Sequence, residues 1–164
     1  MRKIWIYSTV IFLTGLFAAG ISGEKQTPGK KAEKTKAEEK KITEIVISPV
    51  GDQMKYALTE FTVKTGETVR VTMKNVAKLQ GMNHNVVICK PGTDTDAVGI
   101  AGLQVGLEKN YVAERKDVLF HTEVAQPGES KSIEFTAPAP GEYPYICTFP
   151  GHWTLMKGVM KVME

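Results

Sequence analysis

The stretch "CTFPGHWTLMKG" (Cys147–Gly158), near the C-terminus, is the most informative part of this sequence. It places the thiol of Cys147, the imidazole of His152 and the thioether of Met156 within ten residues. A strand that ends at the cysteine, followed by a turn at Pro150-Gly151, would bring these three side chains back to one point. Soft and borderline ligands of this kind suit a copper ion that alternates between Cu(I) and Cu(II), provided that a second imidazole joins them.

The second imidazole has to come from elsewhere in the chain, which contains three histidines in all. His84 lies in "GMNHNVV", where a turn enters a strand. His121 lies inside the alternating run "VLFHTEV", which is typical of an ordinary strand side chain. We therefore predict that His84 is the partner of the loop.

The sequence from Ile42 onward predicts an all-β, antiparallel sandwich, because short β-type runs alternate with turn residues. In "ETVRVTMKN", for example, Val69, Val71 and Met73 fall on one face of a strand. Residues 93–117 form too long an insertion for a hairpin loop and predict a short helix. The eight runs are "ITEIVISPV", "MKYALTEFTV", "ETVRVTMKN", "HNVVICK", "VLFHTEVA", "SKSIEFTAP", "EYPYICTF" and "GVMKVME".

The segments before the sandwich predict export. Residues 1–23 combine a basic start with an apolar run and small residues, as in a secretory signal, although an uncleaved anchor is the alternative. Residues 24–41 are rich in Lys and Glu and predict a solvated linker. The net charge of +3 belongs to these segments, and the domain at 42–164 is close to neutral. Nothing in it resembles a nucleic-acid footprint.

An exported sandwich with two cysteines also has a second interpretation. Cys89 and Cys147 could form an inter-sheet disulfide, with Tyr145 as the tyrosine corner of an immunoglobulin-like binding domain. The tryptophan expected soon after the first cysteine is missing, because Trp153 follows both. A disulfide would also leave His152 without a role, so this is the weaker hypothesis.

From about Ile42 to its end, the chain resembles the azurins, the small blue copper proteins of the cupredoxin family. The resemblance rests on "CTFPGH" and "LMKG", with four residues between Cys and His and three between His and Met. Further matches are "GDQMKY", "HNVV", "GLEKNYV" and "FHT". It implies an eight-stranded Greek-key cupredoxin sandwich or barrel with a short helical flap around 93–117.

The resemblance also implies a single type 1 copper site. Its equatorial ligands would be His84, Cys147 and His152, with Met156 as the distant axial ligand. Azurins direct a backbone carbonyl at the metal from the residue before the first histidine. Here that residue is Asn83, where azurins usually have Gly.

Neighbours of the ligands follow from the same resemblance. Asn85 would tie the two ligand loops together, and the backbone N–H groups of Asn85 and Phe149 would bond to the thiolate. The usual azurin disulfide near the N-terminus is missing, and we interpret Cys89 as a buried free thiol. Trp153 stands where azurins have a smaller residue, and we interpret it as a docking contact beside the ligand His152.

The function implied is the shuttling of single electrons between exported redox proteins in the periplasm, by a protein that we expect to be a monomer. Partners would be c-type cytochromes or a terminal reductase or oxidase. An enzymatic copper centre would need more histidines than the one left over. Copper storage or delivery favours clustered methionines, whereas these are dispersed. The predicted docking patch consists of Met54, Met82, Pro150, Gly151, Trp153 and Leu155, with Phe149 beside it.

Overall fold

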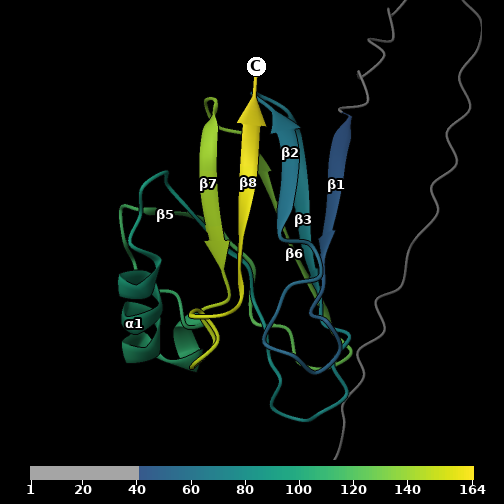
Figure 1. Cartoon of the computed structure of the whole chain (residues 1–164), viewed down its shortest axis with the longest axis vertical. Helices are drawn as coiled ribbons and strands as arrows, with labels where there is room; N and C mark the ends of the chain where they lie inside the picture. Colours follow the sequence, from purple (N-terminus) through teal and green to yellow (C-terminus); the bar gives the residue numbers. More distant parts are fainter. Residues whose placement is uncertain (1–40) are drawn as a thin grey trace, which may run out of the picture. The chain divides into compact units, whose positions relative to one another are not determined.

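The computed structural model describes residues 41–164, so the predicted signal at 1–23 and nearly all of the linker at 24–41 lie outside the described residues. The eight predicted strands are all present (Figure 1). They are β1 (Ile42–Ile47), β2 (Glu60–Lys64), β3 (Thr68–Lys74), β4 (Val87–Cys89), β5 (Val118–His121), β6 (Ser130–Thr136), β7 (Gly141–Ile146) and β8 (Lys157–Met163).

The strands form two sheets, in the orders β1-β3-β6 and β2-β8-β7-β4-β5. Both sheets have edge strands, so this part of the chain is a sandwich rather than a closed barrel. The sequence pattern predicted an antiparallel sandwich, but two of the pairs, β1–β3 and β2–β8, are parallel. The reason is topological: β1 and β3 are separated by β2, which lies in the other sheet, and such a crossover lets the two strands run the same way.

Alternating side chains fill the space between the sheets. Val69, Val71 and Met73 of β3 are completely buried, as the pattern predicts. They belong to the main core, which also contains Cys147 and Met156. The loop from Cys147 to Met156, called the ligand loop below, therefore has both of its ends in the hydrophobic core.

The insertion carries helix α1 (Thr95–Val105) and the 3-10 turn η1 (Leu107–Lys109), which confirms the predicted helix. Asp94 caps the start of α1, because its carboxylate accepts hydrogen bonds from the N–H groups of Asp96 and Ala97. The helix packs on the five-stranded sheet through a second apolar cluster of Val87, Cys89, Val98, Val112 and Ile146.

Both cysteines are free and buried. The disulfide hypothesis is therefore wrong, and the interpretation of Cys89 as a buried thiol is confirmed. Burial raises the pKa of Cys89 to about 11, so this thiol stays protonated at neutral pH.

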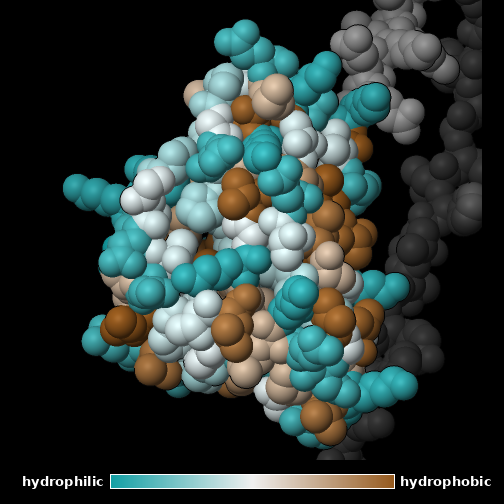
Figure 2. Space-filling view, in the orientation of Figure 1, coloured by the Kyte–Doolittle hydropathy of each residue, from teal (hydrophilic) through white to brown (hydrophobic). Residues whose placement is uncertain are grey.

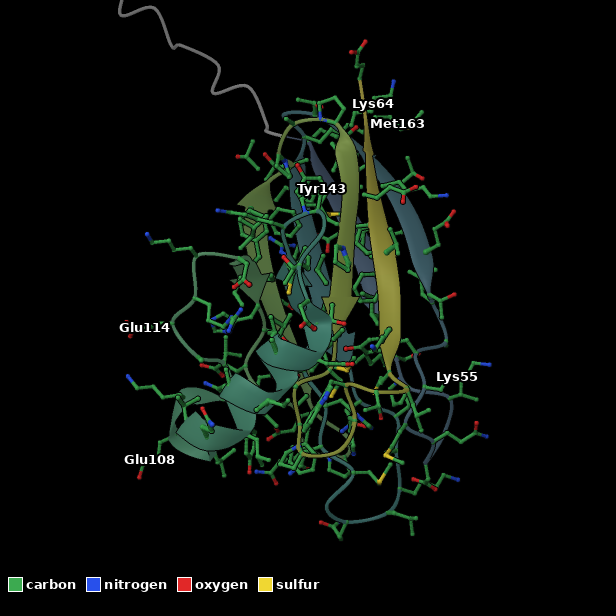
Figure 3. All side chains as sticks on the ribbon, turned by 60° about the vertical axis from the view of Figure 1, so that its left-hand side comes forward. Lys55, Lys64, Glu108, Glu114, Tyr143 and Met163 are labelled. Carbon is green, nitrogen blue, oxygen red and sulfur yellow. The ribbon has the colours of Figure 1, made fainter. Side chains whose placement is uncertain are left out.

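The longer loops between strands gather at one end of the sandwich, beside α1 (Figure 1). Glu108 and Lys55 mark this end in Figure 3, whereas Lys64 and Met163, which are register partners, mark the opposite end. Within residues 41–164, no helix is long and apolar enough to cross a membrane.

Candidate metal centre

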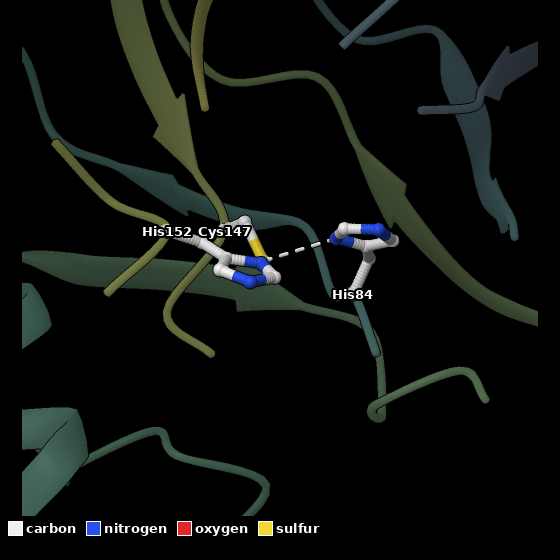
Figure 4. Close-up of side chains that lie close together, drawn as sticks. All are labelled: His84, Cys147 and His152. Atoms are coloured by element: carbon white, nitrogen blue, oxygen red, sulfur yellow. Dashed lines mark hydrogen bonds between the residues drawn. The ribbon is translucent and has the colours of Figure 1, made fainter. Parts of the chain in front are cut away.

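Three side chains from two distant parts of the chain meet at the loop end of the sandwich. The ligand atoms of His84, Cys147 and His152 all lie within 4.8 Å of one another. The Cys147 Sγ is 3.9 Å from the Nδ1 of His84 and 3.6 Å from the Nδ1 of His152 (Figure 4). His121 is exposed on β5 and is not part of this group. The structure thus places His84, and not His121, beside Cys147 and His152.

His84 is positioned by a β-bridge in the connection between β3 and β4. Its N–H donates to the carbonyl of Ala125 at 3.1 Å, and the N–H of Ala125 donates to the carbonyl of His84 at 2.8 Å. This pair of bonds holds the His84 backbone against a neighbouring segment on both sides of its Cα. The imidazole is completely buried.

Cys147 and His152 are brought together by a tight turn. The N–H of His152 donates to the carbonyl of Phe149 at 3.0 Å, and Pro150 and Gly151 occupy the two central positions. Gly151 has φ of +82°, which is the left-handed conformation required at the second central position of a type II turn. The turn predicted at Pro150-Gly151 is therefore present, and it returns His152 to the thiol.

Met156 returns to the same place after one further reversal of the chain. Its N–H donates to the carbonyl of His152 at 2.8 Å, and its carbonyl accepts from the N–H of Cys147 at 3.0 Å. Its side chain is completely buried in the main core beside Cys147. Met156 thus lies in the same core cluster as Cys147.

The site favours neutral forms of its ionisable groups when no metal is present. Burial raises the pKa of Cys147 to about 12, while hydrogen bonds from the backbone N–H groups of Asn85 and Phe149 oppose this rise. Burial and the nearby His152 lower the pKa of His84 to about 4, and burial also lowers the pKa of His152.

This donor set fits copper. The lowered pKa values favour neutral imidazoles, and a neutral imidazole offers one ring nitrogen to a metal. A metal can displace the thiol proton despite the raised pKa, because thiolate ligation couples metal binding to proton release. Two imidazoles, one thiolate and a thioether form the set that is typical of blue copper sites.

Asn85 connects the two ligand loops, as the resemblance implied. Its Oδ1 accepts from the backbone N–H of Thr148 at 2.8 Å, and its Nδ2 donates to the Thr148 hydroxyl at 2.8 Å. The Nδ2 also donates to the carbonyl of Asn110 at 3.0 Å, which ties the segment after η1 to the site.

Two residues of this network were not predicted from the sequence. The hydroxyl of Tyr56 donates to the carbonyl of Asn85 at 2.6 Å. Asn110 has φ of +53°, and its side chain accepts from the N–H of Val124. The motifs "GDQMKY" and "GLEKNYV" contain these residues, but the motifs alone do not indicate what either side chain contacts.

Asn83 fits its position without backbone strain. Among the described residues other than glycine, only Asn110 and Tyr111 have positive φ, so Asn83 does not need the freedom of glycine. Its N–H donates to the carbonyl of Gly81 at 2.9 Å. The tight bend falls on Gly81, which has φ of +85°.

Several residues of the predicted docking patch surround a groove of about 590 Å³. Met54, Met82 and Leu155 line this groove, with Lys55 and Lys157 beside them. Apolar surface is visible among polar side chains at this end of the domain in Figure 2.

The remaining members of the predicted patch differ in exposure. Phe149 and Pro150 are half-buried and Gly151 is exposed. Trp153 is also half-buried, and it packs against the cluster under α1. This internal contact of Trp153 was not predicted.

Comparisons with known proteins agree with this geometry. The family model for copper binding proteins of the plastocyanin/azurin family matches residues 43–163. Auracyanin-A of Chloroflexus aurantiacus is 38% identical over 121 residues, which cover 72% of this chain and 73% of that protein. An azurin of Achromobacter denitrificans is 41% identical over 118 residues, covering 68% and 78% of the two chains.

Solved structures show the same fold. Reduced auracyanin from the photosynthetic bacterium Roseiflexus castenholzii superposes with a TM-score of 0.68 at 42% identity, covering 74% of this chain and 98% of that one. Auracyanin A, described as a "blue" copper protein of Chloroflexus aurantiacus, has a TM-score of 0.70 at 35% identity, covering 75% and 100%.

Proposed function

Because this chain belongs to the plastocyanin/azurin family of copper-binding proteins and is a blue copper electron carrier, we propose that His84, Cys147 and His152 ligate its copper ion. Met156 would supply its thioether as a weak fourth ligand, and the backbone carbonyl of Asn83 would supply an oxygen beside the site. The observation that carries this assignment is the convergence of two Nδ1 atoms and one Sγ within 4.8 Å.

The bound copper ion supplies the one-electron couple between Cu(II) and Cu(I). The protein would hold the ligand side chains in nearly the same arrangement before and after electron transfer. The bridge at His84, the turn before His152 and the hydrogen bonds of Asn85 restrict the movement of the two loops. The backbone N–H groups of Asn85 and Phe149 stabilise negative charge on Cys147, which tunes the reduction potential.

Electrons would enter and leave through His152, which is 4% exposed, whereas His84 and Cys147 are completely buried. The neighbouring apolar groove is the docking surface, with Met54 and Leu155 as its exposed members. Small apolar contacts suit transient redox complexes. As an electron carrier the protein exchanges electrons with redox partners, and we assign these to c-type cytochromes or a terminal reductase or oxidase.

We further propose that the signal at 1–23 exports the domain to the periplasm, where it works as a monomer without catalytic activity of its own. Any membrane contact would then come from an uncleaved anchor or from the linker. The exposed His121 on β5 takes no part in metal binding.

The test is the visible absorption of the full chain after addition of Cu(II), with and without a reductant. We expect an intense blue band that bleaches on reduction. Cys147→Ser should abolish the band, whereas the control His121→Gln should retain it. A colourless wild-type protein, or a band that survives Cys147→Ser, would show that this site is not a blue copper centre.

A further inference from the structure

The buried face of helix α1 touches the ligand loop through glycine. A Cβ added at Gly99 would lie 2.3 Å from both Cγ and Cδ2 of Trp153. A Cβ added at Gly102 would lie 2.1 Å from the carbonyl oxygen of Tyr111 and 3.4 Å from the Cβ of Thr148. Two of these three neighbours, Trp153 and Thr148, belong to the loop between Cys147 and Met156. Glycine at these two positions therefore lets the helix backbone lie where any side chain would clash with its neighbours.

Trp153 directly follows the proposed ligand His152, and the two side chains have different surroundings. The imidazole of His152 faces the Cys147 thiol. The indole of Trp153 packs on Gly99 and on the apolar cluster beneath α1. The peptide between the two residues thus connects the metal site to the helix.

The two proposed histidine ligands are held by different means. The backbone of His84 is paired with Ala125 through two hydrogen bonds to a separate segment. The backbone of His152 bonds to Phe149, Leu155 and Met156, all of which belong to the same loop. Contacts with the rest of the protein must therefore orient this loop. A large aromatic ring loses little conformational entropy when it packs, so Trp153 suits this task.

We propose that Trp153 is a positioning residue, which holds His152 in place for copper by packing its indole against Gly99 of α1. The proposal rests on the assigned role of His152 as a ligand. Outer groups that orient a ligand histidine commonly change metal affinity by about 10-fold to 100-fold when they are replaced. An indole that served only to fill space would affect stability without affecting the metal.

The experiment compares four variants of the full chain. Trp153→Leu removes the indole, and Gly99→Ala forces it away from the helix. Ile100→Ala and Thr154→Ala are the matched controls, because Ile100 is 52% exposed on the same helix and Thr154 is exposed on the same loop. We expect the first two variants to weaken Cu(II) binding at least about tenfold and to shift the blue band and the reduction potential. The controls should match the wild type.

A second readout does not need the metal. In the metal-free protein, Trp153→Leu should shift the imidazole NMR signals of His152 and leave those of His121 unchanged. Two further variants test the packing through Cu(II) affinity. Trp153→Phe keeps a flat ring on Gly99 and should retain most of the wild-type Cu(II) affinity.

In the double variant Gly99→Ala with Trp153→Leu, the alanine should weaken Cu(II) binding little further than Trp153→Leu alone, because the ring that it would strike is gone.

The outcomes separate this proposal from the assigned function. If the wild type is blue and Trp153→Leu matches it in affinity, band position and potential, the positioning role is wrong while the copper assignment stands. If the wild type is not blue, the copper assignment is wrong, and the metal-free His152 signals decide the positioning role. If Gly99→Ala does not fold, the Leu and Phe variants at position 153 decide it.

Discussion

Replacement of Asn85 by Ala should destabilise the metal-free protein by about 3 kcal/mol. The side chain takes part in three hydrogen bonds, to the N–H and the hydroxyl of Thr148 and to the carbonyl of Asn110. Each such bond contributes about 1 kcal/mol net, and a buried group that loses its partner costs about 1–3 kcal/mol. The Thr148 N–H is the critical group, because Asn85 and Thr148 are completely buried and water would have to enter to replace the lost acceptor.

The assay is urea unfolding of the full chain in the presence of a chelator, followed by circular dichroism. With a slope of about 2 kcal/mol per molar urea, a loss of about 3 kcal/mol lowers the midpoint by about 1.5 M. Thr148→Val is the matched control, since it removes one hydroxyl and leaves the other two bonds intact, at a cost of about 1 kcal/mol. If Asn85→Ala cost no more than Thr148→Val, the network would not be what holds the two loops together.

Three further predictions concern the packing and the charge around the site. Tyr56→Phe removes a buried 2.6 Å hydrogen bond to the Asn85 carbonyl, so the free energy of unfolding measured in urea should fall by about 1–2 kcal/mol. An unchanged free energy of unfolding would show that this bond does not stabilise the protein. Gly158→Ala would place a Cβ 2.2 Å from the ring of the fully buried Tyr145, so thermal unfolding should show a loss of about 3 kcal/mol, and an unchanged melting temperature would contradict this packing. The metal-free protein should lose stability as the pH falls from 6.5 to about 4, because His84 takes up a proton only when unfolded in that range. The loss is at most about 3 kcal/mol, and His84→Gln should flatten the pH profile measured by urea unfolding.

The elements of this protein follow closely from local sequence patterns. The alternation of apolar residues predicted all eight strands, and the long interruption at 93–117 predicted the helix. The ligand loop is equally local, because the Pro150-Gly151 turn returns His152 to Cys147 through a hydrogen bond that spans only four residues. Period-two patterns and short turns involve neighbouring residues, so a single sequence contains the information that they need.

The pairing of the strands could not be predicted from these local patterns. An alternating pattern shows which side of a strand is buried, but it does not show which strand lies beside it or in which direction that strand runs. The parallel pairs β1–β3 and β2–β8 arise because the chain crosses between sheets before it returns. Sequence reasoning therefore found the sandwich and missed its mixed pairing.

The sequence by itself determined the loop from Cys147 to Met156 and the strands that flank it, since each depends on residues close together in the chain. Only the tertiary structure decided what surrounds that loop. Asn110 reaches Asn85 across 25 residues, and Gly99 receives the indole of Trp153 from a much later segment of the chain. Such contacts arise when separate segments pack against each other at van der Waals distance, and no local pattern specifies which segments will meet.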